Sequence, residues 1–412
     1  MTSTKPTPAP EHFHPNWQRT LYILFAAQLF TAVGFSSIFP FLPLYVNELG
    51  SSSGLNIEFL AGLVYSSQAL TMMIASPVWG SLADRYGRKL MVERAMFGGT
   101  VILLLMAFVR SAEELVILRA VQGFITGTIP AANAMVASIA PRYRLGYAMG
   151  MLQVGLGLGV ALGPLLGGAI ADAYGYSVSF YITAGLLFLS GVMVWRWTEE
   201  DFVPSNQTER SLPGFASKWR HVLRSPGVVR TFSMRFFTQL GRSSILPVAP
   251  LFIAALLTDE RYLNTFTGLI VGASAITTTL SAGYLGRLGD RIGHHKVILV
   301  CALAGVVFYS LQTQVHFAWQ LLALQALVGV ALGGIIPSIS ALLARFTDPD
   351  DAGAVYGLDS SIDAAGRALA PMIGSAAAVW LGLRSVFAVT AVFFLIMGIL
   401  AFRPVLQVQD KG

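Results

Sequence analysis

Six charged residues occur within long apolar stretches of the sequence, where a charge is least expected. They are Arg119, Arg235, Arg242, Asp359, Asp363 and Arg367. An ionised side chain that faced lipid at the centre of a bilayer would cost about 2.5–3.5 kcal/mol, so these side chains must face protein or water. A carboxyl group beside arginines can bind and release a proton, because its proton affinity depends on which cation is near. The six residues are therefore candidates for proton coupling, and a static network of ion pairs is the alternative interpretation.

The spacing of these charges places them on two helix faces. Arg235 and Arg242 are seven residues apart, which is two helical turns, so they share one face. Asp359, Asp363 and Arg367 follow one another at steps of four residues and share one face of a second helix. We expect Asp363 to carry the proton, because Asp359 could instead act as an anion near the N-terminus of its helix.

The composition predicts that these helices cross a membrane. The 412 residues are 55% hydrophobic and only 12% charged, whereas a soluble domain has about 25% charged residues. A spanning helix needs about 20 apolar residues. We place the spans at 20–46, 59–80, 90–109, 115–138, 147–171, 177–197, 229–257, 265–285, 296–312, 318–343, 354–381 and 384–402. The expected fold class is an all-α membrane protein with 12 transmembrane helices.

One long polar stretch divides the spans into two groups of six. We expect a cytoplasmic N-terminal tail at 1–19, a six-helix bundle at 20–197, a cytoplasmic linker at 198–228, a second bundle at 229–402 and a cytoplasmic tail at 403–412. The apolar stretch that begins near Leu21 is too long for the core of a signal peptide. Arg110, Arg261 and Arg384 fall on the opposite side of the membrane from most basic residues, which places both termini in the cytoplasm.

The two groups of spans repeat each other in sequence. Thr31, Gly34, Ser36, Ser37, Ile38, Pro40, Pro43 and Leu44 recur 207 residues later as Thr238, Gly241, Ser243, Ser244, Ile245, Pro247, Pro250 and Leu251. The match holds one register through the later helices, where Pro164 corresponds to Pro371. Two parallel six-helix repeats around a site at the membrane midplane are the arrangement of alternating-access transporters.

A short loop after the second span concentrates charge between two glycines and predicts a conformational latch. Its residues are Gly80, Asp84, Arg85, Gly87 and Arg88. Asp84 could accept hydrogen bonds from a basic side chain or from an exposed helix N-terminus. The second copy holds Asp290 and Arg291 but continues with His294 and His295 instead of Arg-Lys, so we expect its latch to be weaker. An ordinary positive loop on the cytoplasmic side is the alternative interpretation.

Small residues dominate the fifth span. They are Gly155, Gly159, Gly163, Gly167 and Gly168, together with Pro164. Such a surface lets neighbouring helices approach closely and slide, and Pro164 interrupts the backbone hydrogen bonds so that the helix can bend. Tight packing without movement is the alternative interpretation.

Three of these motifs resemble those of a known family. The run Gly80-Ser-Leu-Ala-Asp84-Arg85-Tyr-Gly87-Arg88-Lys89 resembles the loop 2–3 signature of the major facilitator superfamily. Leu118-Arg119-Ala-Val-Gln122-Gly123-Phe-Ile-Thr-Gly127 is similar to its fourth-helix motif, and residues 155–168 are similar to the fifth-helix motif of its antiporters. The resemblance covers essentially the whole chain and is closest to the 12-helix drug:proton antiporters.

The resemblance implies a fold of two pseudo-symmetric six-helix bundles and a role for Arg119 in proton transfer. Many of these antiporters also have an acid in the first helix, and this sequence has none between Leu21 and Asn47. That departure favours span eleven as the proton site. The implied substrate cavity would be lined by Gln28, Phe35, Tyr65, Gln68, Phe124, Phe236, Gln239 and Gln325. Aromatic rings and amides suit amphipathic ligands of varied structure.

The expected function is proton-coupled export of amphipathic drugs or toxic compounds across the cytoplasmic (inner) membrane. The expected partners are protons, small amphipathic substrates and the lipid bilayer, with the chain as a monomer and with no nucleic acid, cofactor or metal. The sequence has no phosphate-binding loop ending in Gly-Lys, which excludes an ATP-driven pump. It also lacks a plausible catalytic nucleophile, metal cluster or acid pair outside the spans, so we expect no enzyme.

Two other functions stay open from the sequence. Proton-coupled uptake of a small nutrient or organic anion could use Arg235 and Arg242 to bind the anion. A non-transporting receptor on a transporter fold would need a sizeable soluble signalling segment, and the longest loop is only the linker. The glycine pattern of the fifth span favours antiport over uptake, by resemblance alone.

Overall fold

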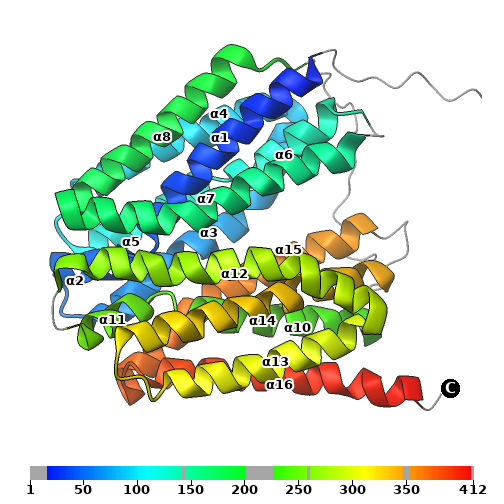
Figure 1. Cartoon of the computed structure of the whole chain (residues 1–412). Coiled ribbons are helices and arrows are strands. Elements are labelled where there is room, and N and C mark those ends of the chain that lie inside the picture. Colours follow the sequence, from blue (N-terminus) through cyan, green and yellow to red (C-terminus); the bar gives the residue numbers. More distant parts are fainter. Residues whose placement is uncertain (1–15, 142–143, 201–225, 258–259, 347–351, 410–412) are drawn as a thin grey trace, which may run out of the picture.

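The structure, a computed structural model, describes residues 16–141, 144–200, 226–257, 260–346 and 352–409. All regular elements in these ranges are helices (Figure 1). The first half of the chain contains α1 (Trp17–Ile38), α2 (Leu42–Leu49), α3 (Ile57–Tyr86), α4 (Arg88–Met106), α5 (Ala112–Ile125), α6 (Thr128–Ile139), α7 (Leu145–Tyr174) and α8 (Tyr176–Trp197). The second half contains α10 (Pro226–Ser244), α11 (Ala249–Leu256), the 3₁₀ turn η2 (Glu260–Tyr262), α12 (Leu263–Ile292), α13 (His294–Gln312), α14 (Ala318–Arg345), α15 (Ala352–Leu381) and α16 (Ser385–Gln409).

Within the described ranges, 10 segments are long and apolar enough to cross a membrane. The two other predicted spans, 90–109 and 115–138, correspond to α4 and to the pair α5 and α6. The start of α4 is strongly charged, and a break at Gly127, where φ is +148°, makes α5 and α6 too short individually. The prediction of an all-α membrane fold is confirmed. Most of the predicted linker and of the N-terminal tail lies outside the described residues, whereas α16 continues to Gln409, into the predicted C-terminal tail.

Prolines interrupt the first helix of each half at equivalent places. Pro40 and Pro43 separate α1 from α2, and Pro247 and Pro250 separate α10 from α11. A proline within a helix removes one backbone hydrogen bond, but at the first helical turn it is well tolerated. The repeated prolines therefore produce the same break, followed by the same short helix, in both halves.

The repeat seen in the sequence is also a repeat of contacts. In the first half the hydroxyls of Ser37 and Thr183 are 3.2 Å apart, and their equivalents Ser244 and Thr390 are 3.0 Å apart. Gly167 packs directly on the carbonyl of Ser37, and its equivalent Gly374 packs on the carbonyl of Ser244. The predicted pseudo-symmetry of the two bundles is therefore confirmed at the level of individual side chains.

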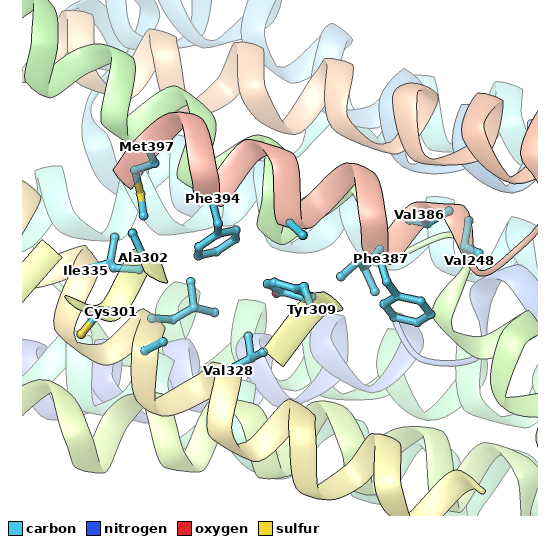
Figure 2. Packing of buried hydrophobic residues seen from close by; sticks show 14 of the residues in the cluster. Val248, Cys301, Ala302, Tyr309, Val328, Ile335, Val386, Phe387, Phe394 and Met397 are labelled. Atoms are coloured by element: carbon cyan, nitrogen blue, oxygen red, sulfur yellow. The ribbon is translucent and has the colours of Figure 1, made fainter. Parts of the chain in front are cut away.

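An aromatic and aliphatic core holds the second half together (Figure 2). The ring of Tyr309 on α13 lies 5.1 Å from that of Phe394 on α16, and Phe252 and Phe387 form a second pair at 5.1 Å. Ring pairs at this separation contribute beyond the area they bury. Because lipid is as apolar as these side chains, close packing rather than escape from water holds the helices together.

The two halves meet along α7 with α12 and along α3 with α15. We call the side where α1 begins and α16 ends the terminal side, and the side of α2 and α11 the opposite side (Figure 1). Close approaches between the halves lie toward the opposite side, where Gly268 packs on the carbonyl of Pro164. Toward the terminal side, α7 carries Gly157 and Gly150, which lie 7 and 14 residues before Pro164. A side chain added at either glycine would have nothing within 4 Å of its Cβ. The bundle is therefore closed on the opposite side and opens toward the terminal side.

Replacement of Gly167 by valine should destabilise the protein by about 1–3 kcal/mol, because the added side chain would meet the Ser37 backbone. Gly157→Val is the matched control, since it adds the same side chain to the same helix where nothing lies within 4 Å. Thermal unfolding of the detergent-solubilised variants measures the difference. Equal melting temperatures for the two variants would contradict this account of the α1–α7 interface.

Candidate functional site

A bidentate ion pair links two helices of the second half. Nε of Arg235 on α10 donates to Oδ1 of Asp359 on α15 at 3.1 Å, and Nη2 donates to Oδ2 at 3.0 Å. The same Nη2 also lies 3.1 Å from the hydroxyl of Ser340 on α14. Asp359 is buried and lies two turns inside α15. Its charge is therefore matched by an arginine, and the helix-end role that its position suggested does not apply.

The second acid of the ladder has a different partner and is more exposed. Oδ2 of Asp363 accepts from Nη2 of Arg367, one turn later on α15, at 2.9 Å. The side chain of Asp363 is 25% exposed and that of Arg367 is 51% exposed. Asp359 and Asp363 are thus close in sequence but bound to separate arginines, and the second pair is the more exposed of the two.

Arg242 is an exposed cation in the last turn of α10. Its charge interacts with those of Asp363 and Arg367 on α15 and with that of Arg235, which lies on the same face of α10. Among the described residues it forms no hydrogen bond and no ion pair within 4 Å. Leu246, four residues further along, packs against the core of the first half. Arg242 therefore faces the space between the halves.

Arg119 is buried inside the first half and has neutral partners. Its Nε donates to the carbonyl of Val64 at 3.2 Å, its Nη1 donates to Gln122 at 2.7 Å, and its guanidinium lies 5.9 Å from the ring of Phe39. No carboxylate of the described residues lies within ion-pair distance of it. The structure thus separates Arg119 from the charged network of the second half.

Several predicted cavity residues form hydrogen bonds or ring contacts within their own half. The Tyr65 hydroxyl donates to the carbonyl of Phe39 at 2.6 Å, and the amide of Gln239 donates to Ser243 at 2.8 Å. The remaining ones are distributed as follows: Gln325 bonds to Gln312, Phe236 contacts the ring of Phe237, Phe35 packs against the first-half core, Gln28 is buried on α1, and Gln68 is half-buried on α3. A shared substrate cavity lined by these residues stays a prediction.

Phe124 lies instead in a groove between α3, α4 and α5. The groove has a volume of about 710 Å³ and is almost entirely apolar. Trp79 donates from its indole N–H to the carbonyl of Phe124 at 2.6 Å, and the guanidinium of Arg94 lies 3.4 Å above the Trp79 ring. Arg94 and Trp79 were not predicted as site residues, although a charge inside the stretch 90–109 was the available signal.

The charged loop between α3 and α4 turns at Gly87, where φ is +98°, as its equivalent Gly293 does at +97°. The backbone N–H groups of Arg88 and Lys89 donate to the carboxylate of Glu200 at 3.0 and 2.7 Å. Glu200 thus caps the N-terminus of α4 from beyond the end of α8, a role that the sequence analysis missed. Arg85 is exposed, whereas the side chain of Asp84 and the surroundings of Gly80 lie outside what the structure describes.

The second copy of the loop is held within its own half. The carboxylate of Asp290 lies 3.2 Å from Nε2 of His294, and Nδ1 of the same ring lies 3.4 Å from the hydroxyl of Ser338 on α14. The Asp290 side chain is largely exposed, as is Arg291. The histidine that replaces arginine here therefore bonds the acid of its own loop.

The glycines of α7 form a stripe against α1. Gly155, Gly159, Gly163 and Gly167 face Phe25, Ala32, Ser36 and Ser37 in turn, and the Ser36 hydroxyl donates to the carbonyl of Gly159 at 2.8 Å. Gly168 and Pro164 lie on another face and contact α12 of the second half. Most of the stripe therefore packs inside one half, and only its last part reaches the interface between the halves.

Comparison with known proteins agrees with this architecture. The sequence model of the Major Facilitator Superfamily matches residues 24–252 and, again, 231–412. The chain belongs to this superfamily, and it is a multi-pass membrane protein of the secondary-transporter fold.

Two relatives are similar to this chain over nearly the full length of both proteins. The multidrug resistance protein MdtG of Serratia proteamaculans is 35% identical over 389 residues, which cover 94% of this chain and 93% of that protein. MdtG of Salmonella typhimurium is 34% identical over 383 residues, covering 91% and 93%. A bacterial homologue of the lysosomal transporter Spinster, solved in an inward-facing and unoccupied conformation, has a TM-score of 0.76 at 15% identity, covering 95% of this chain and 97% of that one.

Arg235→Gln should destabilise the protein strongly, by about 3–5 kcal/mol, because it leaves the buried Asp359 carboxylate without its cation. The double variant Arg235→Met with Asp359→Leu should recover most of that loss, since it removes both charges together. Denaturant or thermal unfolding in detergent measures both. A double variant as unstable as the single one would show that the pair does more than neutralise charge.

Proposed function

We propose that the protein is a proton-coupled exporter of amphipathic drugs or toxic compounds in the inner membrane of a bacterium. The observation that carries this proposal is the set of partly exposed charges between two symmetric halves that are closed on one side only. A charge-bearing site at the interface of two repeats suits alternating access, in which one half rocks against the other. The MdtG relatives, named as multidrug resistance proteins, support export of drugs.

The terminal side is, in this proposal, the cytoplasmic side. Most basic residues of the sequence fall in segments on that side, and basic loops favour the cytoplasm. The arrangement described above then corresponds to an inward-facing conformation, in which the space between the halves is open to the cytoplasm. Substrate would enter from that side or from the adjoining lipid leaflet.

Asp363 is the proposed proton carrier. Its carboxylate is partly exposed and bound to Arg367, which is itself half exposed, and the charge of Arg242 is near. Movement of α10 relative to α15 would change how much positive charge surrounds Asp363 and hence its affinity for a proton. Asp359 is buried and bound on both oxygens by Arg235, so it holds α10 to α15 and is a poorer candidate for exchange.

The apolar groove that contains Phe124, Trp79 and Arg94 is the proposed contact for amphipathic substrates on the first half. Its volume of about 710 Å³ lies within the usual range of small-molecule sites. Aromatic rings give it adaptable contacts, and Arg94 is the only charged residue among those that line it. The chain is proposed to act as a monomer.

A second candidate function is proton-coupled uptake of an organic anion. The exposed guanidinium of Arg242, which has no ion-pair partner among the described residues, is the observation that favours it. A guanidinium binds carboxylate or phosphate groups with two parallel hydrogen bonds. The direction of transport separates the two functions.

Cells that express the protein should accumulate less of an amphipathic fluorescent dye than control cells, and a protonophore should abolish the difference. Asp363→Asn, which mimics the protonated carboxyl, should lower energised export by about tenfold or more while leaving dye exchange down a gradient intact. Glu58→Gln, at the start of α3, is the matched control and should behave like the wild type. Export by Asp363→Asn at the wild-type rate would place the proton elsewhere, and accumulation that rises with expression would favour uptake.

Asp84→Asn should reduce transport sharply without preventing insertion, because it removes the charge proposed to latch the cytoplasmic side. Asp290→Asn should cost less, since among the described residues the bonded partner of Asp290 is His294 of its own loop. Dye export at matched expression levels compares the two variants. Full activity of Asp84→Asn would indicate that this loop only helps to orient the protein in the membrane through its positive charge.

A further inference from the structure

A carboxylate of the first half holds the beginning of a helix in the second half. Oδ1 of Asp172, near the end of α7, accepts from the backbone N–H of Asn264 at 3.1 Å and from its side-chain amide at 2.8 Å. Oδ2 accepts from the backbone N–H of Thr265 at 2.7 Å and from its hydroxyl at 2.5 Å. Both oxygens of one side chain are thus engaged by the other half of the molecule.

The position of these bonds adds to their strength. Asn264 and Thr265 are in the first turn of α12, where backbone N–H groups lack partners within the helix and carry partial positive charge. The residue before α12, Tyr262, provides no side-chain hydrogen bond to this end. Asp172 therefore caps α12 from a distance of 92 residues in sequence, with charge-assisted hydrogen bonds.

The cap lies where the halves are closed. In the same region Gly168 packs on the carbonyl of Asn264, and Gly268 packs on the carbonyl of Pro164. Further along the same face of α7, toward the terminal side, no neighbouring atom lies within 4 Å of the Cβ position of Gly157. The halves cannot separate on the opposite side unless the four bonds of Asp172 break.

We propose that Asp172 is the positioning residue that keeps the opposite side closed, and that its release accompanies the opening of that side. The proposal rests on alternating access as the proposed function. The device exists in one copy, because the residue of the second half equivalent to Asp172 is Val379. The contact of Asp172 with α12 on this side would alternate with that of the Asp84 loop on the terminal side.

Glu113 provides a matched control on the same side of the molecule. Its carboxylate accepts hydrogen bonds from Ser51, Ser52 and Ser53, all within the first half. The Ser53 hydroxyl and the Ser52 N–H hold the pKa of Glu113 far below its usual range, so it is ionised at neutral pH. Removal of its charge disturbs a comparable set of bonds without touching the contact between the halves.

The test measures distances between the halves in lipid nanodiscs. Cys301 is the only cysteine, so Cys301→Ala gives a background for paired spin labels. Phe108→Cys with Phe317→Cys reports on the opposite side, and Arg144→Cys with Arg345→Cys reports on the terminal side; all four positions are exposed. Electron–electron double resonance gives the distance distribution for each pair.

Asp172→Asn should raise the ratio of open to closed molecules on the opposite side by about tenfold and shorten distances on the terminal side. Asp172→Glu, which keeps the charge, should restore much of the closed population, and Glu113→Gln should leave both distributions unchanged. Wild-type distances in Asp172→Asn would overturn the proposal. The distance measurement needs no substrate, so it is independent of the export assay. If the wild type fails to export dye but Asp172→Asn still opens the opposite side, the proposed function is refuted and the role of Asp172 stands.

Discussion

Hydrocarbon cannot solvate a charge, and this constraint determines how the polar side chains of the protein are arranged. Three arginines within the spans are compensated in three different ways. Arg235 binds a carboxylate at 3.0 Å, Arg119 binds a carbonyl and an amide, and Arg94 lies 3.4 Å above an indole ring. These interactions differ in how readily the arginine can leave its partner. A buried bidentate pair resists change, whereas a half-exposed pair such as Asp363 with Arg367 can respond to a proton or a ligand.

The two halves share a backbone frame but not a charge pattern. Contacts such as that of Gly167 with Ser37 recur as Gly374 with Ser244, so the frame is symmetric. The charges of α10 and α15 have no counterparts at equivalent positions of the first half, which are Gln28, Phe35, Leu152, Leu156 and Val160. The second half thus supplies the titratable groups, and the first half supplies an apolar groove with one arginine. This division lets proton and substrate sites diverge while the frame that moves them stays symmetric.

How much the sequence could predict depends on whether a feature is local or requires two elements to meet. Helix spans, the repeat and the shared face of Asp359, Asp363 and Arg367 follow from spacing along one segment, and the structure agrees with them. The pairing of Arg235 with Asp359 across 124 residues could not be assigned, because either acid fits the face. The cap by Glu200 and the cap by Asp172 were missed, because single acids at span ends look like ordinary polar loop residues until the helices they cap are in place.

The strength of the contacts between the halves must be limited if the molecule is to alternate. Apolar packing alone would change little between two rocked arrangements, because lipid and side chains are equally apolar. Hydrogen bonds to a helix N-terminus are directional, so a small rotation of α12 against α7 would break all four bonds of Asp172 almost together. Gly168 and Gly268 allow the close approach that brings the carboxylate within reach, yet they add no side chain that must be repacked when the helices part. The combination of small residues with one carboxylate therefore makes the closed side well defined without making it permanent.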